Sequence, residues 1–202
     1  HTPVALGTAT NANVAATEVI TGREWLRRRF RAGRFLHMVW MHLYRRDFIE
    51  RHRFRFIPRL IHEDVIWTTE ALLAAQRVRY TGHIAVHYRI PVRRFNPDQA
   101  QRRLQAIVDS SVVNAEGLAR MCASLGDDPE LNALLGDHLV DGALSVFHKL
   151  PKMPDRAAAA ATLRRLRTNG FMRLLWRHAQ SAAQRRRIAR HWLRSWLAGA
   201  AR

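Results

Sequence analysis

The spacing of apolar residues changes character near residue 96. Before that point, apolar side chains come in short runs that are separated by polar or turn-forming residues. After it, they recur every three or four positions over long stretches, as they do on one face of an amphipathic helix. The pattern therefore predicts a mixed first part over residues 1–95 and a mainly α-helical extension over 96–202.

The first part is expected to combine helices with a few short strands. Thr21 with Glu24 three residues later is a helix-start signature. The apolar run 35–44 fits a buried strand and a buried helix equally well, and residues 1–20 fit a loop with one or two short strands. The remaining patterns predict helices over 21–31, 45–50 and 63–76, and strands over 77–80 and 83–89.

The extension is expected to contain three helices and a basic tail. Apolar stripes predict helices over 104–125, 131–147 and 157–167. The tail over 171–202 fits one or two helices in which arginines alternate with Leu, Phe and Trp. Arginine and tryptophan on amphipathic helices are typical of a membrane-surface anchor. A solvated helix face with ordinary packing tryptophans fits the same residues.

Composition narrows the class of protein. The 202 residues are 48% hydrophobic and include six Trp and eight Phe, which is incompatible with a disordered chain. The net charge of +18 comes almost entirely from arginine and favours an anionic partner: nucleic acid, nucleotide phosphate or an anionic membrane. The single cysteine, Cys122, excludes an internal disulfide, and its apolar surroundings predict a buried thiol.

Two adjacent carboxylates, Glu63 and Asp64, stand where a loop is predicted to turn into a helix. Acidic residues in a first helical turn are often purely structural, because they complement the helix dipole. A carboxylate held in this way also suits a general base that takes a proton from a hydroxyl. A histidine-only metal site is disfavoured, because His83 and His87 would stand about 13 Å apart on a strand.

Six pieces of the sequence together resemble a known family. In chain order they are Thr21-Gly22-x-Glu24-Trp25-Leu26, Val39-Trp40-x-x-Leu43-Tyr44-Arg45-Arg46-x-Phe48, Phe54-x-Phe56, His62-Glu63-Asp64, Ala74-Ala75-x-Arg77-Val78 and Tyr88-Arg89. They resemble the second, acceptor-side half of family-two bacterial glycosyltransferases with a GT-A fold. The resemblance covers about residues 15–95. It implies an α/β fold that is an incomplete GT-A half domain with few strands, followed by the helical extension, so that the chain is predominantly helical overall.

The resemblance also implies roles for individual residues. Asp64 would be the general base of an inverting sugar transfer, with Glu63 beside it binding or orienting the acceptor. We expect substrate contacts from His62, Trp40, Trp67, Tyr88 and Arg89. The implied donor is a nucleotide sugar, and the implied acceptor is a glycan or a lipid-linked hydroxyl in cell-surface polysaccharide or lipopolysaccharide synthesis.

Two departures from the family pattern limit this interpretation. The nucleotide-binding half, with the Asp-x-Asp motif that holds Mg²⁺ or Mn²⁺, has no counterpart in these 202 residues, so we expect the isolated chain to be inactive. The stretch from His87 to Phe95 also lacks the serine that usually follows in the family. We expect a cytoplasmic protein, peripheral at the inner membrane face. The alternatives are a non-catalytic membrane-associated helical protein and a basic nucleic-acid-binding protein, which is disfavoured because no nucleic-acid-binding motif is visible.

Overall fold

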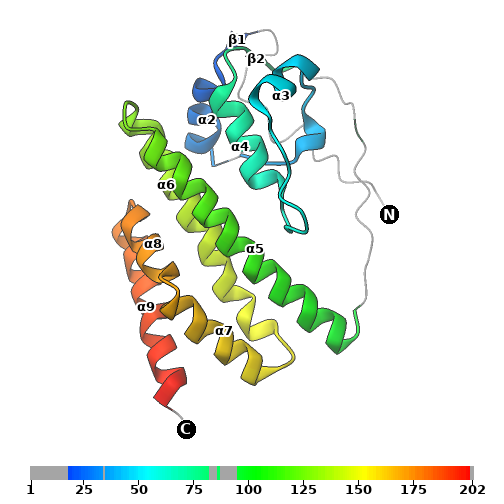
Figure 1. Ribbon diagram of the computed structural model, residues 1–202. Helices are drawn as coiled ribbons and strands as arrows, with labels where there is room; N and C mark the ends of the chain where they lie inside the picture. The colour runs from blue at the N-terminus through cyan, green and yellow to red at the C-terminus, as the bar shows by residue number, and fades with distance from the viewer. Residues whose placement is uncertain (1–17, 34, 82–85, 87–94, 201–202) are drawn as a thin grey trace. The chain divides into compact units, whose positions relative to one another are not determined.

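The computed structural model describes residues 18–33, 35–81, 86 and 95–200, with side chains up to residue 196. The chain divides into two compact units, residues 1–93 and 94–202 (Figure 1). Most of the described residues are helical, and the sheet that they form has two strands. This confirms the expectation of a predominantly helical chain with an incomplete α/β part.

The first unit is built on two helices that pack against each other, α2 (Gly22–Arg31) and α4 (Asp64–Ala74). The two-residue strands β1 (Val19–Ile20) and β2 (Val78–Arg79) pair antiparallel, with Val19 opposite Arg79. Because β1 leads into α2 and β2 follows α4, the strand pair ties the start of one helix to the end of the other.

The junction between α2 and α4 leaves no room for a side chain at Gly22. Its amide donates a hydrogen bond to the Ala75 carbonyl at 2.8 Å. A Cβ atom at this position would lie 1.8 Å from the Leu72 carbonyl oxygen. Just before it, the Thr21 hydroxyl accepts a hydrogen bond from the Glu24 amide at 3.2 Å, which confirms the predicted helix start.

The segment between α2 and α4 is mostly irregular. The run 35–44, expected to be a buried strand or helix, is neither: it holds only a 3₁₀ turn, η1 (Val39–Met41), and none of its residues is buried. Its backbone is fixed from outside, because the Thr68 hydroxyl of α4 donates a hydrogen bond to the His37 carbonyl at 2.7 Å. The short helix predicted at 45–50 is confirmed as α3 (Arg46–His52). Residues 1–17 and nearly all of the predicted strand 83–89 lie outside the described residues.

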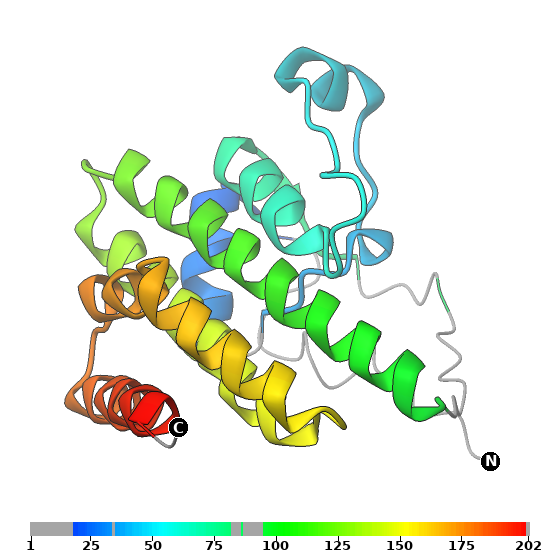
Figure 2. The same cartoon turned by 60° about the horizontal axis from the view of Figure 1, so that its bottom comes forward.

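The second unit is a helical bundle that begins with α5 (Pro97–Ser124) and α6 (Pro129–Leu144), joined by a short turn. Asn96 and Gln99 form a capping box at the start of α5. Figure 2 shows α7 (Arg156–Thr168) alongside α5, where the Thr162 hydroxyl donates a hydrogen bond to Gln105 at 2.9 Å. The other elements are two 3₁₀ turns, η2 (Ser145–His148) and η3 (Leu150–Lys152), and the helices α8 (Phe171–His178) and α9 (Ala182–Ala200).

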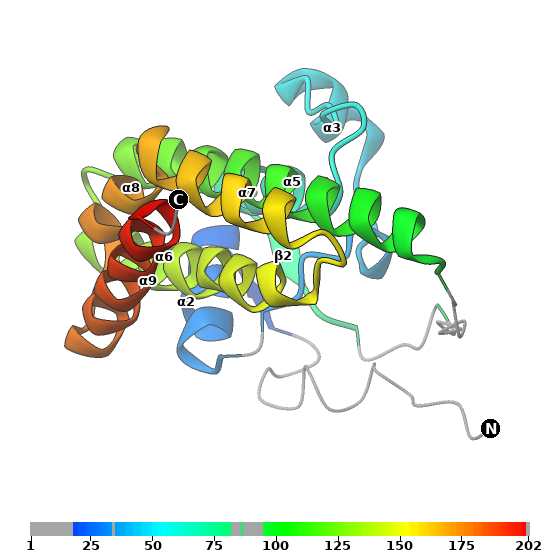
Figure 3. The same ribbon diagram turned by 90° about the horizontal axis from the view of Figure 1, so that it is seen from below.

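The core of this unit is mainly aliphatic. Figure 3 shows α9 beside α6 and α7, and Ile188 is the fully buried side chain at the centre of α9. Leucines spaced by four along α6 form the other side of this core: Leu131, Leu135 and Leu139. The predicted helices of the extension are therefore present, and the tail consists of two of them. In the part of the chain that is described, no helix combines the length and apolar composition needed to cross a membrane.

Candidate active site around Glu63 and Asp64

The two carboxylates stand at the start of α4, as the sequence predicts. Glu63 is the residue before the helix, and its side chain makes no capping hydrogen bond. Asp64 is the first helical residue, and the backbone amides of Asp64 and Val65 at this helix start lower the pKa of its carboxyl group. The Asp64 carboxylate therefore stands at the amide end of α4, while the Glu63 side chain is exposed to solvent.

Burial makes Asp64 a stronger base than an ordinary aspartate. The side chain is half-buried, and burial raises the pKa of its carboxyl group. The neighbouring Glu63 carboxylate raises this pKa further, and His62 lowers it. A carboxylate with a raised pKa holds a transferred proton better, which suits a general base that works near neutral pH.

Neither carboxylate pairs with an arginine or a lysine in the described part of the chain. The other acidic residues nearby are paired: Asp47 with Arg45 and Arg51, and Glu50 with Arg46. The Glu63 and Asp64 carboxylates therefore remain open to a ligand hydroxyl.

The loop that leads to the carboxylates has an unusual backbone. Arg53, Arg59 and His62 have φ values of 55°, 62° and 59°, in the left-handed region that non-glycine residues seldom adopt. Among the described non-glycine residues, these three alone have positive φ. Such conformations concentrate at functional sites, where the surrounding fold holds them in place. His62, which is exposed, adopts one directly before Glu63.

An aromatic cluster surrounds Trp67, which lies one turn after Asp64 on α4. The Trp67 ring is only 5% exposed, with Tyr44 edge-on at 4.8 Å and Phe56 stacked at 5.1 Å. Trp67 was expected to offer a face to a sugar ring, but the structure uses it as a core residue. Burial in this cluster also raises the pKa of Tyr44 to about 12.

The exposed aromatic surface comes from other residues. Phe56 is 45% exposed and rests on Trp67, so its outer face is open to solvent. Trp40 is 38% exposed, so it is a surface ring and not the core residue that its apolar neighbours suggested. Sequence reasoning did not select Phe56, although the alternation in Phe54-x-Phe56 was a signal that both rings lie on one side of an extended segment.

Threonines on the buried side of α4 hold this helix in place. Thr68 and Thr69 are fully buried, and Thr68 binds the His37 carbonyl. Thr69 donates to the Val65 carbonyl at 2.7 Å and lies 3.5 Å from the His37 ring. Sequence reasoning assigned neither of them a role. They fix α4, and with it Asp64, against the segment that carries Trp40.

The described part of the candidate site includes neither two of the expected substrate contacts nor a set of metal ligands. Tyr88 and Arg89 lie outside the described residues. Over 18–33, 35–81 and 95–200, no group of three His, Cys, Asp or Glu side chains gathers where a metal ion would bind. Glu63 and Asp64 alone do not complete the coordination of Mg²⁺ or Mn²⁺, which takes six ligands.

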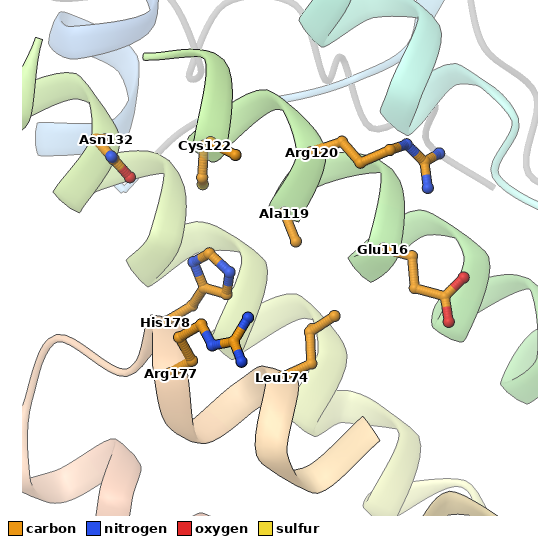
Figure 4. A pocket seen from close by; sticks show the side chains of 9 residues that line it. Glu116, Ala119, Arg120, Cys122, Asn132, Leu174, Arg177 and His178 are labelled. Carbon is orange, nitrogen blue, oxygen red and sulfur yellow. The ribbon is translucent and has the colours of Figure 1, made fainter. Parts of the chain in front are cut away.

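The second unit has an open hollow of about 550 Å³ between α5, α6 and α8. Figure 4 shows Glu116 and Arg120 of α5 across from Arg177 and His178 of α8. Cys122 also lines it, but its side chain is buried, as the sequence predicted, and burial raises the pKa of the thiol to about 11. A thiol that stays protonated is a poor nucleophile, so the hollow has no catalytic group of this kind.

Comparison with known proteins supports a glycosyltransferase relationship. Over 73 residues the chain is 47% identical to a protein of Escherichia coli strain K12 named uncharacterized glycosyltransferase YibD. The match includes 36% of this chain and 21% of that protein, so the chain spans about a fifth of the length of this relative. No family model and no solved structure matches.

Proposed function

We propose that this chain is the acceptor-side part of an inverting glycosyltransferase with a GT-A fold. It would act in the transfer of a sugar from a nucleotide-sugar donor to a hydroxyl of a glycan or lipid-linked acceptor, in cell-surface polysaccharide or lipopolysaccharide synthesis. The observation that carries the proposal is the 47% identity over 73 residues to a protein named as a glycosyltransferase. The half-buried, unpaired Asp64 supplies the chemistry that such a transfer needs.

The proposed reaction is a single displacement. The acceptor O–H gives its proton to the Asp64 carboxylate while its oxygen forms a bond to the anomeric carbon of the donor sugar. The bond between that carbon and the diphosphate oxygen breaks, and its electron pair leaves with the nucleotide. Attack from the face opposite the leaving group inverts the configuration of the anomeric carbon.

The local structure favours Asp64 over Glu63 as the base. Asp64 is half-buried in the first turn of α4 and has a pKa that burial raises, whereas Glu63 is exposed and makes no capping hydrogen bond. Glu63 is then suited to binding a second acceptor hydroxyl. The exposed rings of Phe56 and Trp40 are available for stacking on acceptor sugars. A divalent cation remains part of the proposal, with ligands from outside the described residues.

The test is the substitution Asp64→Asn in the full-length protein. The amide keeps the shape of the side chain but accepts no proton, so transfer should fall by a factor of about 10² to 10⁴ while donor binding persists. Transfer is measured as nucleotide release with acceptor present, and donor binding by calorimetry. Asp47→Asn is the matched control, since Asp47 is an exposed carboxylate on α3 in ion pairs with arginines.

Each outcome separates the base from a structural role. Full turnover in Asp64→Asn would remove the base assignment. An equal loss in Asp47→Asn would show that the loss follows from changed charge in this unit and not from the missing base. Glu63→Gln is expected to raise the KM for the acceptor with a smaller effect on kcat, since it removes a binding contact and leaves the base in place.

A further inference from the structure

The C-terminal helices carry an extreme charge distribution. Residues 156–202 contain twelve arginines and no aspartate, glutamate or lysine. Some of these arginines are neutralised within the unit: Arg165 pairs with Asp109 and Arg187 with Asp141. Five exposed arginines form no hydrogen bond or ion pair with any other described residue: Arg173, Arg177, Arg186, Arg190 and Arg194.

Three of these five lie on α9, whose orientation is fixed by its buried side. Gln184, Ile188 and Ser195 face the bundle, and the Gln184 side chain donates a hydrogen bond to Asp137 at 2.8 Å. At 100° per residue, the positions opposite to them are Arg186, Arg190 and Leu193. Arg194 and Trp196 stand on the two flanks. We call this surface the α9 face: Arg186, Arg190, Leu193, Arg194 and Trp196.

The α9 face combines its cations with large apolar side chains. Leu193 is 63% exposed and Trp196 is 61% exposed. Trp196 is held in position, because the Arg167 guanidinium of α7 lies 4.2 Å from the centre of its ring. Side chains of this size leave water when a suitable partner covers them, and the arginines beside them demand that the partner be anionic.

We propose that the α9 face docks onto an anionic lipid bilayer. Tryptophan and leucine enter the boundary between headgroups and acyl chains, while the flexible arginine side chains reach lipid phosphates. No acidic residue in 156–202 opposes the approach to a negative surface. A nucleic acid explains the arginines but gives Leu193 no partner, because this side chain has neither a hydrogen-bonding group nor a ring for stacking. The anionic inner leaflet would hold the protein as a peripheral membrane protein.

The experiment is co-sedimentation of the full chain with vesicles. One set consists of phosphatidylcholine alone, and the other of phosphatidylcholine mixed with phosphatidylglycerol. The chain should bind the mixed vesicles and not the neutral ones. Arg186→Gln with Arg190→Gln should weaken this binding by about five-fold for each arginine removed. Leu193→Ser should also weaken it, although this substitution changes no charge.

The control is Arg45→Gln with Arg46→Gln, which removes the same net charge from exposed side chains of the first unit. This pair should leave vesicle binding nearly unchanged. An equal loss in the control, or equal binding to neutral vesicles, would overturn the proposal. A competition with duplex DNA would also overturn it, if the DNA released the chain from vesicles and its binding depended on Arg186 and Arg190 but not on Leu193. The assay contains no sugar donor, so its result is independent of the transferase proposal.

Discussion

Gly22→Ala is the most informative test of how the first unit is packed. A methyl group at Gly22 would lie 1.8 Å from the Leu72 carbonyl oxygen and 3.1 Å from the Ala75 side chain. Ordinary van der Waals contact begins at 3.4 Å, so the end of α4 has to move away by about 1.6 Å. The two Leu72 atoms that the added methyl group would meet belong to the backbone, so they cannot rotate aside as a flexible side chain does.

The expected loss of stability follows from three contributions. Overpacking a tight contact costs about 1–3 kcal/mol. Moving α4 also weakens the hydrogen bond from the Gly22 amide to the Ala75 carbonyl, worth about 1 kcal/mol. Alanine gains back up to about 1 kcal/mol, because it favours the helical conformation more than glycine does. The free energy of unfolding of the first unit should therefore fall by about 2 kcal/mol.

Hydrogen exchange measured by mass spectrometry reports on α2 and α4 separately from the second unit. A loss of about 2 kcal/mol lowers the protection of the most stable α2 and α4 amides by about 30-fold. The matched control is Gly142→Ala in α6, where an added Cβ meets nothing within 4 Å. That substitution should stabilise its helix by up to about 1 kcal/mol. Unchanged or increased protection in Gly22→Ala would refute the packing argument.

Three further predictions concern single side chains. Thr21→Ala removes the hydroxyl that caps α2 and should destabilise the first unit by about 1 kcal/mol, whereas Thr21→Ser should restore most of this in the same exchange experiment. Burial raises the pKa of Asp64, so its contribution to stability is present in acid and is lost as pH rises through the folded pKa; Asp64→Asn should therefore raise the urea midpoint of the first unit at neutral pH but not in acid. Burial lowers the pKa of His191 from 6.5 to about 4, and the nearby Arg194 charge contributes to this shift. The second unit should therefore lose stability as the pH falls from 6.5 to about 4. His191→Phe keeps the stack on Phe147 and should flatten that pH dependence in thermal unfolding; an unchanged slope would contradict the assignment.

Elements governed by local signals could be predicted from the sequence. The Thr21 cap, the start of α4 at Asp64 and the turn before α6 depend on residues within four positions of each other, so a short window contains the whole cause. The run 35–44 could not be predicted in this way. Its conformation depends on a hydrogen bond from Thr68, thirty-one residues away from His37. The aromatic and apolar composition of this run indicated burial, but all of its residues are half-buried or exposed.

The candidate site shows the same division between local and tertiary causes. The sequence indicates a carboxylate pair at a helix start, because that pattern is local. It does not indicate the positive φ of His62, since most histidines have negative φ and the residue type alone does not single out this position. Nor does it distinguish the buried Trp67 from the exposed Phe56. Both are aromatic, and the tertiary fold decides which ring of the stacked pair faces solvent.

The arginines of the first unit and those of α9 differ in the partners that they have. In α2 and α3 several arginines pair with carboxylates three or four residues away on the same helix, as Arg28 does with Glu24 and Arg46 with Glu50. In α9 the same local pairing is impossible, because the helix contains no acidic residue. Arg187 instead pairs with Asp141 of α6, Arg185 donates to the Ala179 carbonyl, and Arg186, Arg190 and Arg194 remain exposed. The absence of acids from the tail therefore has a definite physical consequence: it leaves exposed positive charge beside Leu193 and Trp196, which is the combination on which the proposed bilayer docking rests.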